Sequence, residues 1–260
     1  MQKIIYFLIA LFATGLGSMT GAAGGVIMKP LIDLISEYDT VTIGLLTGIT
    51  LVAMGLVNLG GHIRNKRRID LRFLLFLTPG AVAGGIAGGA VLNTLSGMIR
   101  DTSLKAVQNV VILILMGISF LYIHYKERFP GPAIRQGAFI LFIGLLLGMV
   151  SAFLGIGGGP INVSVILFFF AIRPRDAAMY SIIVIEFAQI AKLAAFASET
   201  GFGGFDLRML PAMILGGVLG GFAGAQLNRR VSERRILIIF NAIQVFVILA
   251  CVLNILGVMH

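Results

Sequence analysis

Gly155-Ile156-Gly157-Gly158-Gly159-Pro160 interrupts a long apolar run, with GAFILFIGLLLGMVSAFL before it and INVSVILFFFAI after it. Four glycines and a proline in six residues disfavour a continuous helix, because glycine costs about 1 kcal/mol and proline about 3 kcal/mol relative to alanine. Backbone groups freed by such a break are tolerated at membrane depth only inside protein or beside a watery cavity. The stretch therefore predicts a broken helix, a device with which secondary transporters bind small ions.

The composition places this break in a polytopic membrane protein. The 260 residues are 58% hydrophobic and 12% charged, with a mean hydropathy of +1.01, whereas soluble domains are about one quarter charged. No polar stretch is long enough to fold as an aqueous domain, so one membrane domain over residues 1–260 is expected. The net charge of +9 comes from basic residues in short loops, which indicates membrane topology rather than nucleic-acid binding.

The apolar residues form long segments, and most have about 20 residues, the length that crosses a ~30 Å hydrocarbon core. Two of these segments are longer and carry a glycine cluster in the middle, which predicts a hairpin bent at the cluster. These two are 4–35 and 136–172, and the others are 41–61, 73–95, 104–124, 177–197, 209–228 and 236–257.

The sequence also repeats itself. Asp70-Leu71-Arg72 returns as Asp206-Leu207-Arg208, and Gly21-Ala22-Ala23-Gly24-Gly25 returns as the cluster at Gly155–Gly159, at nearly the same separation along the chain. Self-similarity of this kind predicts two copies of one structural unit. We expect repeat one over residues 1–125 and repeat two over 136–260.

The basic residues predict that the second repeat is inverted in the membrane. In the first half they mark the loop before the third segment, whereas in the second half they mark the loop one segment later. Because basic loops face the cytoplasm, the halves enter from opposite sides, and each consists of a glycine-broken hairpin plus three transmembrane helices. Eight plain spans are the alternative, and they violate the positive-inside rule in one half. The residues concerned are Arg64, Lys66, Arg67, Arg68 and Arg72, then Arg229, Arg230, Arg234 and Arg235.

The two glycine clusters are the first candidate site. The helix after each cluster begins with free amides and the positive end of its dipole, so two such ends facing each other would bind an anion. Asn162, two residues after the second cluster, could donate to the same anion. The predicted substrate-binding residues are therefore Gly21, Gly24, Gly25, Gly155, Gly157, Gly158, Gly159 and Asn162.

Other glycines have a different spacing and a different meaning. Gly80-x-x-x-Gly84-x-x-x-Gly88 and Gly216-x-x-x-Gly220-x-x-x-Gly224 follow the small-xxx-small pattern, which predicts close helix packing. These ladders could join two copies as a homodimer or serve within one chain.

Glu186, Gln189 and Lys192 form the second candidate site, because spacings of three place them on neighbouring turns of one membrane helix. Ionisable groups inside a span usually face a cavity or a partner. Lys192 either attracts the anion or snorkels to the outer interface, and Glu186 either carries a coupled proton or is a structural hydrogen-bond partner. Lys29 is either an anion-attracting entrance residue or an ordinary interfacial lysine.

A Gly-x-Gly-Gly-Gly cluster followed by an apolar arm, once per half of a small polytopic chain, resembles the TauE/SafE family of sulfite and organosulfonate exporters. The first copy in that family usually continues with Pro-Leu five residues after the last glycine. Pro30 and Leu31 fit this pattern, while Ala23 stands where a glycine is usual. In the second copy all four glycines fit, but Ser164 replaces the later proline.

The resemblance covers nearly the whole chain and implies an exporter or importer of a small, often sulfur-containing anion such as sulfite or an organosulfonate. We expect a multi-pass protein of the cell inner membrane whose partners are the anion and the lipid bilayer. The chain has no Walker-type loop, so transport would be secondary, by alternating access. A passive anion channel and a non-transporting membrane scaffold or assembly protein are the alternatives.

An enzyme is not expected. His62, His124 and His260 lie at segment ends without metal-ligand spacing, and no span holds a serine or cysteine nucleophile beside a base. We therefore predict neither a metal nor a cofactor.

Overall fold

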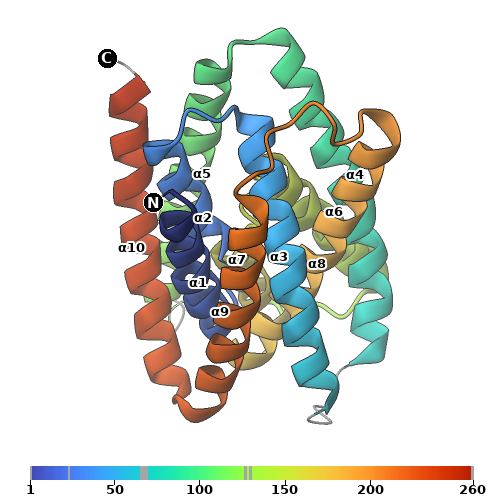
Figure 1. Ribbon diagram of the computed structural model, residues 1–260. Coiled ribbons are helices and arrows are strands. Elements are labelled where there is room, and N and C mark those ends of the chain that lie inside the picture. Colours follow the sequence, from blue (N-terminus) through green and yellow to red (C-terminus); the bar gives the residue numbers. More distant parts are fainter. Residues whose placement is uncertain (1, 23, 65–69, 126–127, 129–130, 259–260) are drawn as a thin grey trace.

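The computed structural model describes residues 2–22, 24–64, 70–125, 128 and 131–258 (Figure 1). Ala23, the basic residues Lys66, Arg67 and Arg68, and His260 lie outside this described part. Within it every regular element is a helix, which confirms the predicted all-helical polytopic membrane protein. Eight helices are long and apolar enough to cross a membrane: α1 (Gln2–Thr20), α3 (Thr40–Arg64), α4 (Leu71–Met98), α5 (Asp101–Tyr125), α6 (Gly137–Leu154), α8 (Pro174–Glu199), α9 (Leu210–Arg230) and α10 (Glu233–Val258).

The other two described helices are half as long. α2 (Gly25–Ile35) has 11 residues and α7 (Gly159–Phe170) has 12. At 1.5 Å per residue they extend only about 16–18 Å, roughly half of the hydrocarbon core. Each long apolar segment thus folds as one crossing helix, a break, and a half-helix that returns. We call residues 21–24 the first break and residues 155–158 the second break.

Contacts between connections show which helix ends lie together. At one end of the bundle the Thr40 amide donates to Asp101 (2.8 Å), and the Tyr38 hydroxyl lies 3.5 Å from the Asp206 carboxylate. At the other end Arg175 donates to the Val231 carbonyl at 2.8 Å. Figure 1 shows the α4–α5 connection at the top and the α9–α10 connection at the bottom. These two helix pairs occupy equivalent positions in the predicted repeats, yet their connections lie at opposite ends of the bundle.

The glycine ladders pack helices from different halves of the chain against each other. A Cβ at Gly84 would overlap the carbonyl oxygen of Leu145 on α6, and one at Gly220 would overlap that of Leu11 on α1. The most extensive helix contacts are accordingly those of α4 with α6 and of α1 with α9. The prediction of close packing is confirmed, and both ladders are used within one chain.

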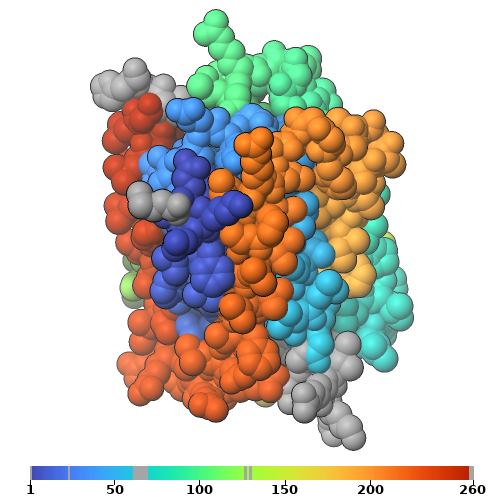
Figure 2. Space-filling view, viewed as in Figure 1, coloured from blue at the N-terminus to red at the C-terminus, as the bar shows by residue number. Residues whose placement is uncertain are grey.

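The outer surface of the bundle is apolar, as a lipid-facing surface must be. Figure 2 shows one such face, with α1 between α10 and α9. Large hydrophobic side chains on these helices are exposed, among them Phe12 (65%), Phe222 (59%) and Leu249 (58%). The polar side chains of the candidate sites are buried instead.

Candidate functional site

Both breaks are made by glycines in conformations that other residues rarely adopt. Gly21 ends α1 with φ +78°, and the second break contains Gly155, Gly157 and Gly158 with φ between +63° and +76°. Only glycine enters this left-handed region without a steric penalty. The helices therefore stop at the predicted glycines, and α2 and α7 begin at Gly25 and Gly159.

The structure brings the two breaks together in the interior. A Cβ at Gly25 would overlap Ile156 of the second break, and one at Gly159 would overlap Ala22 of the first. The starts of α2 and α7 thus lie against each other's break, with their free amides and positive dipole ends close together. Pro160 has no N–H, so α7 offers fewer donors than α2.

Two hydroxyl groups tie these breaks to the opposite half of the chain. The Thr47 hydroxyl on α3 lies 2.9 Å from the carbonyl oxygen of Gly155 and shares its hydrogen between that oxygen and the Ile43 carbonyl of its own helix, at 2.7 Å. Ser181 on α8 donates to the carbonyls of Gly21 at 3.0 Å and Gly159 at 3.3 Å. Sequence analysis missed both residues, although Thr47 and Ser181 have the same separation along the chain as the two glycine clusters.

Removing these hydroxyls should destabilise the protein. We expect Thr47→Val and Ser181→Ala each to cost about 1–3 kcal/mol, because each leaves a buried carbonyl without its donor. Thr50→Val is the matched control, since the Thr50 hydroxyl bonds only to Leu46 within its own helix. The midpoint of thermal unfolding in detergent measures the difference. Equal midpoints for Thr47→Val and Thr50→Val would contradict a bridging role for the hydroxyl.

The second break carries polar side chains that the first lacks. Ser151 donates to the Gly157 carbonyl at 2.8 Å, and the Asn162 amide lies 3.4 Å from both the same carbonyl and the Ser151 hydroxyl. The Asn162 side-chain oxygen is buried and has no hydrogen-bond partner among the described residues. Gly17 and Met28 occupy the equivalent positions of the first repeat. The pair of breaks is therefore chemically asymmetric.

The polar residues of α8 lie against glycines of α3. Each of these glycines makes room for one polar side chain of α8, and a larger residue in its place would displace that side chain. For example, a Cβ at Gly48 would lie 3.0 Å from the side-chain oxygen of Gln189. The three pairs are Glu186 with Gly55, Gln189 with Gly48, and Lys192 with Gly44. The Gln189 amide also donates to the Ser151 carbonyl at 3.2 Å. This contact joins the polar face of α8 to the second break.

Both candidate lysines are buried inside the protein. Lys29 is 0% exposed and forms an ion pair with Asp33 at 3.1 Å, whereas Lys192 is 3% exposed and its ammonium has no hydrogen-bond partner among the described residues. The alternative of interfacial or snorkelling lysines is therefore wrong for both. Asp33, the counter-charge of Lys29, was not anticipated from the sequence.

The lysines approach the second break from two helices. The Lys29 side chain lies 3.9 Å from the position a Cβ would take at Gly155, and the Lys192 ammonium lies 3.4 Å from that position at Gly44. Gly44 itself lies against Gly155. The structure thus brings Lys29, Lys192 and Gln189 close to the second break, whereas Glu186 lies against Gly55 of α3.

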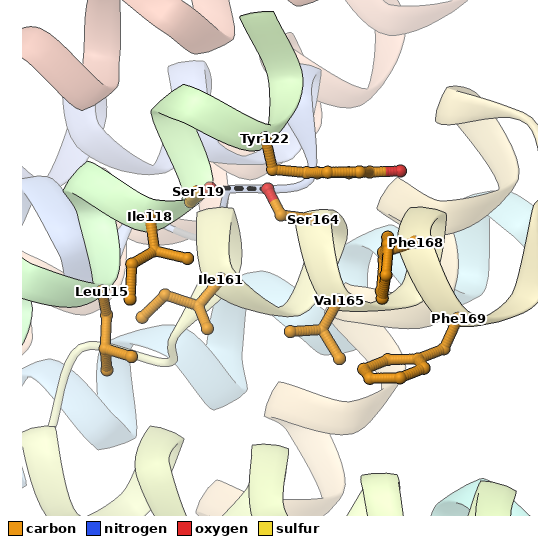
Figure 3. Close-up of a pocket in the computed structure, with 9 residues that line it drawn as sticks. All are labelled: Leu115, Ile118, Ser119, Tyr122, Ile161, Ser164, Val165, Phe168 and Phe169. Carbon is orange, nitrogen blue, oxygen red and sulfur yellow. Dashed lines mark hydrogen bonds between the residues drawn. The ribbon is translucent and has the colours of Figure 1, made fainter. Parts of the chain in front are cut away.

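A separate cavity of about 310 Å³ lies between α5 and α7 (Figure 3). Its walls are apolar apart from Ser119, Ser164 and Tyr122, and the two serine hydroxyls are hydrogen-bonded to each other at 2.5 Å. Gln244 on α10 donates to Ser119, so this amide joins helices as expected for a polar residue in a span. No predicted site residue lines the cavity.

A second cavity, of about 360 Å³, opens at the end of the bundle that contains Asp39 and Asp101. Asn93 and Phe196 line both this cavity and a much smaller one, of about 10 Å³, beside Lys192. The small space holds about one water molecule. Asn93 and Phe196 therefore separate the Lys192 side chain from the larger vestibule.

Among the described residues no group of three His, Cys, Asp or Glu side chains could hold a metal ion. The available chemistry is that of buried amides, hydroxyls and cations, which bind anions without transforming them.

Eight membrane-spanning helices and two half-helices whose starts meet in the interior are the architecture of a membrane transporter. The chain belongs to the TauE/SafE family, because residues 6–251 match the family described as Sulfite exporter TauE/SafE. It is 23% identical over 272 residues to the Probable membrane transporter protein YunE of Bacillus subtilis (strain 168). The alignment covers 95% of this chain and 96% of that protein. No solved structure matches the chain. The predicted family is confirmed, and it is a family of membrane transporters rather than enzymes.

Proposed function

We propose that this protein is a secondary transporter that exports a small sulfur-containing anion, such as sulfite or an organosulfonate, across the cell inner membrane. The observation that carries the proposal is the meeting of the two half-helix starts, together with the unpaired Lys192 side chain beside Gly44, which lies against Gly155 of the second break. Helix starts bind oxyanions through their amides and dipoles, and a buried cation without a counter-charge favours an anion beside it.

In this proposal the amides after Gly24-Gly25 and Gly158-Gly159 bind the oxyanion. Gly21, Gly155 and Gly157 supply the turns that place these amides, and the Asn162 side chain adds a polar group at the second break. Gln189 holds the polar face of α8 against that break through the Ser151 carbonyl.

The two buried lysines have different roles in the proposed site. Asp33 neutralises Lys29, so this pair contributes little net charge, whereas the Lys192 side chain has no counter-charge among the described ion pairs. Lys192 is therefore the residue that attracts the anion. The Lys29 side chain lies close to Gly155, and its ion pair with Asp33 places a local dipole beside the second break.

We further propose that residues 1–125 and 136–260 are inverted repeats whose relative rocking alternates access to the breaks. The opposite directions of the equivalent α4–α5 and α9–α10 pairs support this arrangement. The end with the basic residues would face the cytoplasm. Because both glycine ladders are used within the chain, the proposed transport unit is a single chain.

Lys192→Met should weaken anion binding. We expect sulfite to raise the unfolding temperature of the purified wild-type protein, because a ligand that binds the folded state stabilises it. For Lys192→Met, at least about tenfold more sulfite should be needed for the same shift, since the unpaired charge is gone. Lys105→Met is the matched control, because Lys105 is paired with Asp101 at the helix end. Equal sulfite dependence in wild type and Lys192→Met would contradict the assignment.

A further inference from the structure

Glu186 is a buried carboxyl group that the proposed anion site does not use. It lies in the middle of α8, is 2% exposed, and fits against α3 only because residue 55 is glycine. One carboxyl oxygen is buried without a hydrogen-bond partner among the described residues, and the ion pairs of that part of the chain include none to Glu186. A structural hydrogen-bond role would require such partners.

Among the side chains that the structure describes, no cation lies opposite Glu186 on the helices that pack against α8. α6 and α7 have no ionisable side chain, and the charged residues of α3, α4, α1 and α10 lie in terminal turns. Within α8 itself, Lys192 is six residues further on, about 9 Å along the helix axis. The ionisable residues of the neighbouring helices are His62, Arg64, Arg72, Lys3, Tyr6, Glu233, Arg234, Arg235 and Cys251.

An unpaired carboxylate and an unpaired ammonium, both inside a membrane protein, are each unfavourable. Both penalties are relieved if Glu186 carries a proton and Lys192 is neutralised by the transported anion. An ionised Glu186 would repel an anion bound beside Lys192, because little polar medium separates the two charges inside the bundle. The protonation of Glu186 and the binding of the anion are therefore favourable together and unfavourable separately.

We propose that Glu186 couples transport to protons: it takes up a proton when the anion binds, releases it when the anion leaves, and so moves anion and proton in the same direction. Export then requires an outward anion gradient that exceeds the opposing proton gradient. The proposal rests on the proposed function, because it requires an anion beside Lys192. Gln189, between the two groups and hydrogen-bonded to Ser151, places the coupled pair next to the second break.

The test is uptake of radiolabelled sulfite into proteoliposomes, with and without a pH gradient that is acidic outside. Protein-free liposomes correct for passive entry. Wild type should exchange sulfite at equal pH and accumulate several-fold more under the gradient. Glu186→Gln should exchange at equal pH but lose the response to the gradient, because glutamine cannot carry the proton. Glu37→Gln, at an exposed position in the connection between α2 and α3, is the matched control and should respond as wild type does.

Sulfite itself titrates, but it does so equally for every variant, so a difference between variants belongs to the protein. Glu186→Asp keeps an ionisable group and should retain the response at a lower rate. Exchange in wild type without any response to the gradient, or a wild-type response in Glu186→Gln, would overturn the coupling and leave the proposed function intact. Loss of exchange in correctly folded Glu186→Gln would also overturn it, by making Glu186 a binding residue. Absence of exchange in wild type would instead contradict the proposed function.

Discussion

Gly158→Leu is expected to abolish transport while the protein still folds and inserts into the membrane. Gly158 has φ +63°, and a Cβ there would lie 2.8 Å from the Ser151 hydroxyl and 3.0 Å from the Asn162 side-chain oxygen. A larger side chain therefore displaces both polar groups of the second break and changes the start of α7. The surrounding helices keep their own contacts, because the glycine ladders lie elsewhere. Sulfite transport in proteoliposomes measures the loss, and monodispersity in detergent measures folding.

Gly201→Leu is the matched control for this variant. Gly201 also has a left-handed conformation, with φ +71°, but no neighbouring atom lies within 4 Å of the position of its Cβ. It therefore has a similar backbone strain, about 1–2 kcal/mol, without the crowding. Transport should survive in Gly201→Leu and fail in Gly158→Leu. Normal transport by folded Gly158→Leu would exclude the second break from the binding site.

Gly84→Leu is expected to prevent stable folding. The α4 helix approaches α6 so closely that even a methyl group at residue 84 would overlap the Leu145 carbonyl. Backbone cannot yield as a flexible side chain does, so the helices must separate, at a cost of about 3 kcal/mol or more. We expect little monodisperse protein in detergent and a strongly lowered unfolding temperature.

Gly117→Leu tests whether this loss comes from packing. Gly117 lies in a membrane helix, α5, and nothing lies within 4 Å of the position of its Cβ. The substitution removes a helical glycine at both sites, so the helix propensity changes equally. A folded Gly117→Leu beside an unfolded Gly84→Leu would confirm the ladder as an intrachain contact. Wild-type stability of Gly84→Leu would contradict the described packing of α4 on α6.

Local sequence signals were sufficient to predict the backbone of the site. Clustered glycines and a proline disfavour a helix whatever tertiary contacts surround them, and the helices indeed stop at Gly21 and Gly155. The ladders were predictable for the same reason, because a spacing of four places small residues on one helix face. These features depend on residues close together in sequence.

The side-chain partners could not be predicted, because they depend on contacts between distant segments. Lys192 is five residues from the end of its apolar segment, where a lysine can reach the interface. It is buried because Gly44 and Gly89, on two other helices, leave room for it. The pairing of α8 with the glycines of α3 has no local signal. The pairing of Lys29 with Asp33 did have a local signal, since Asp33 follows Lys29 by four residues and so lies on the same helix face.

The most direct test of the account is counterflow of radiolabelled sulfite into proteoliposomes of the purified protein, preloaded with unlabelled sulfite. A carrier with one alternating site predicts transient accumulation of label driven by the internal sulfite, competition by another small sulfur-containing anion such as thiosulfate, and no accumulation for Gly158→Leu. Label that only equilibrates, with large ionic currents, would contradict a carrier and favour a channel. No entry of label and no competition would contradict anion transport altogether, and would favour a membrane scaffold.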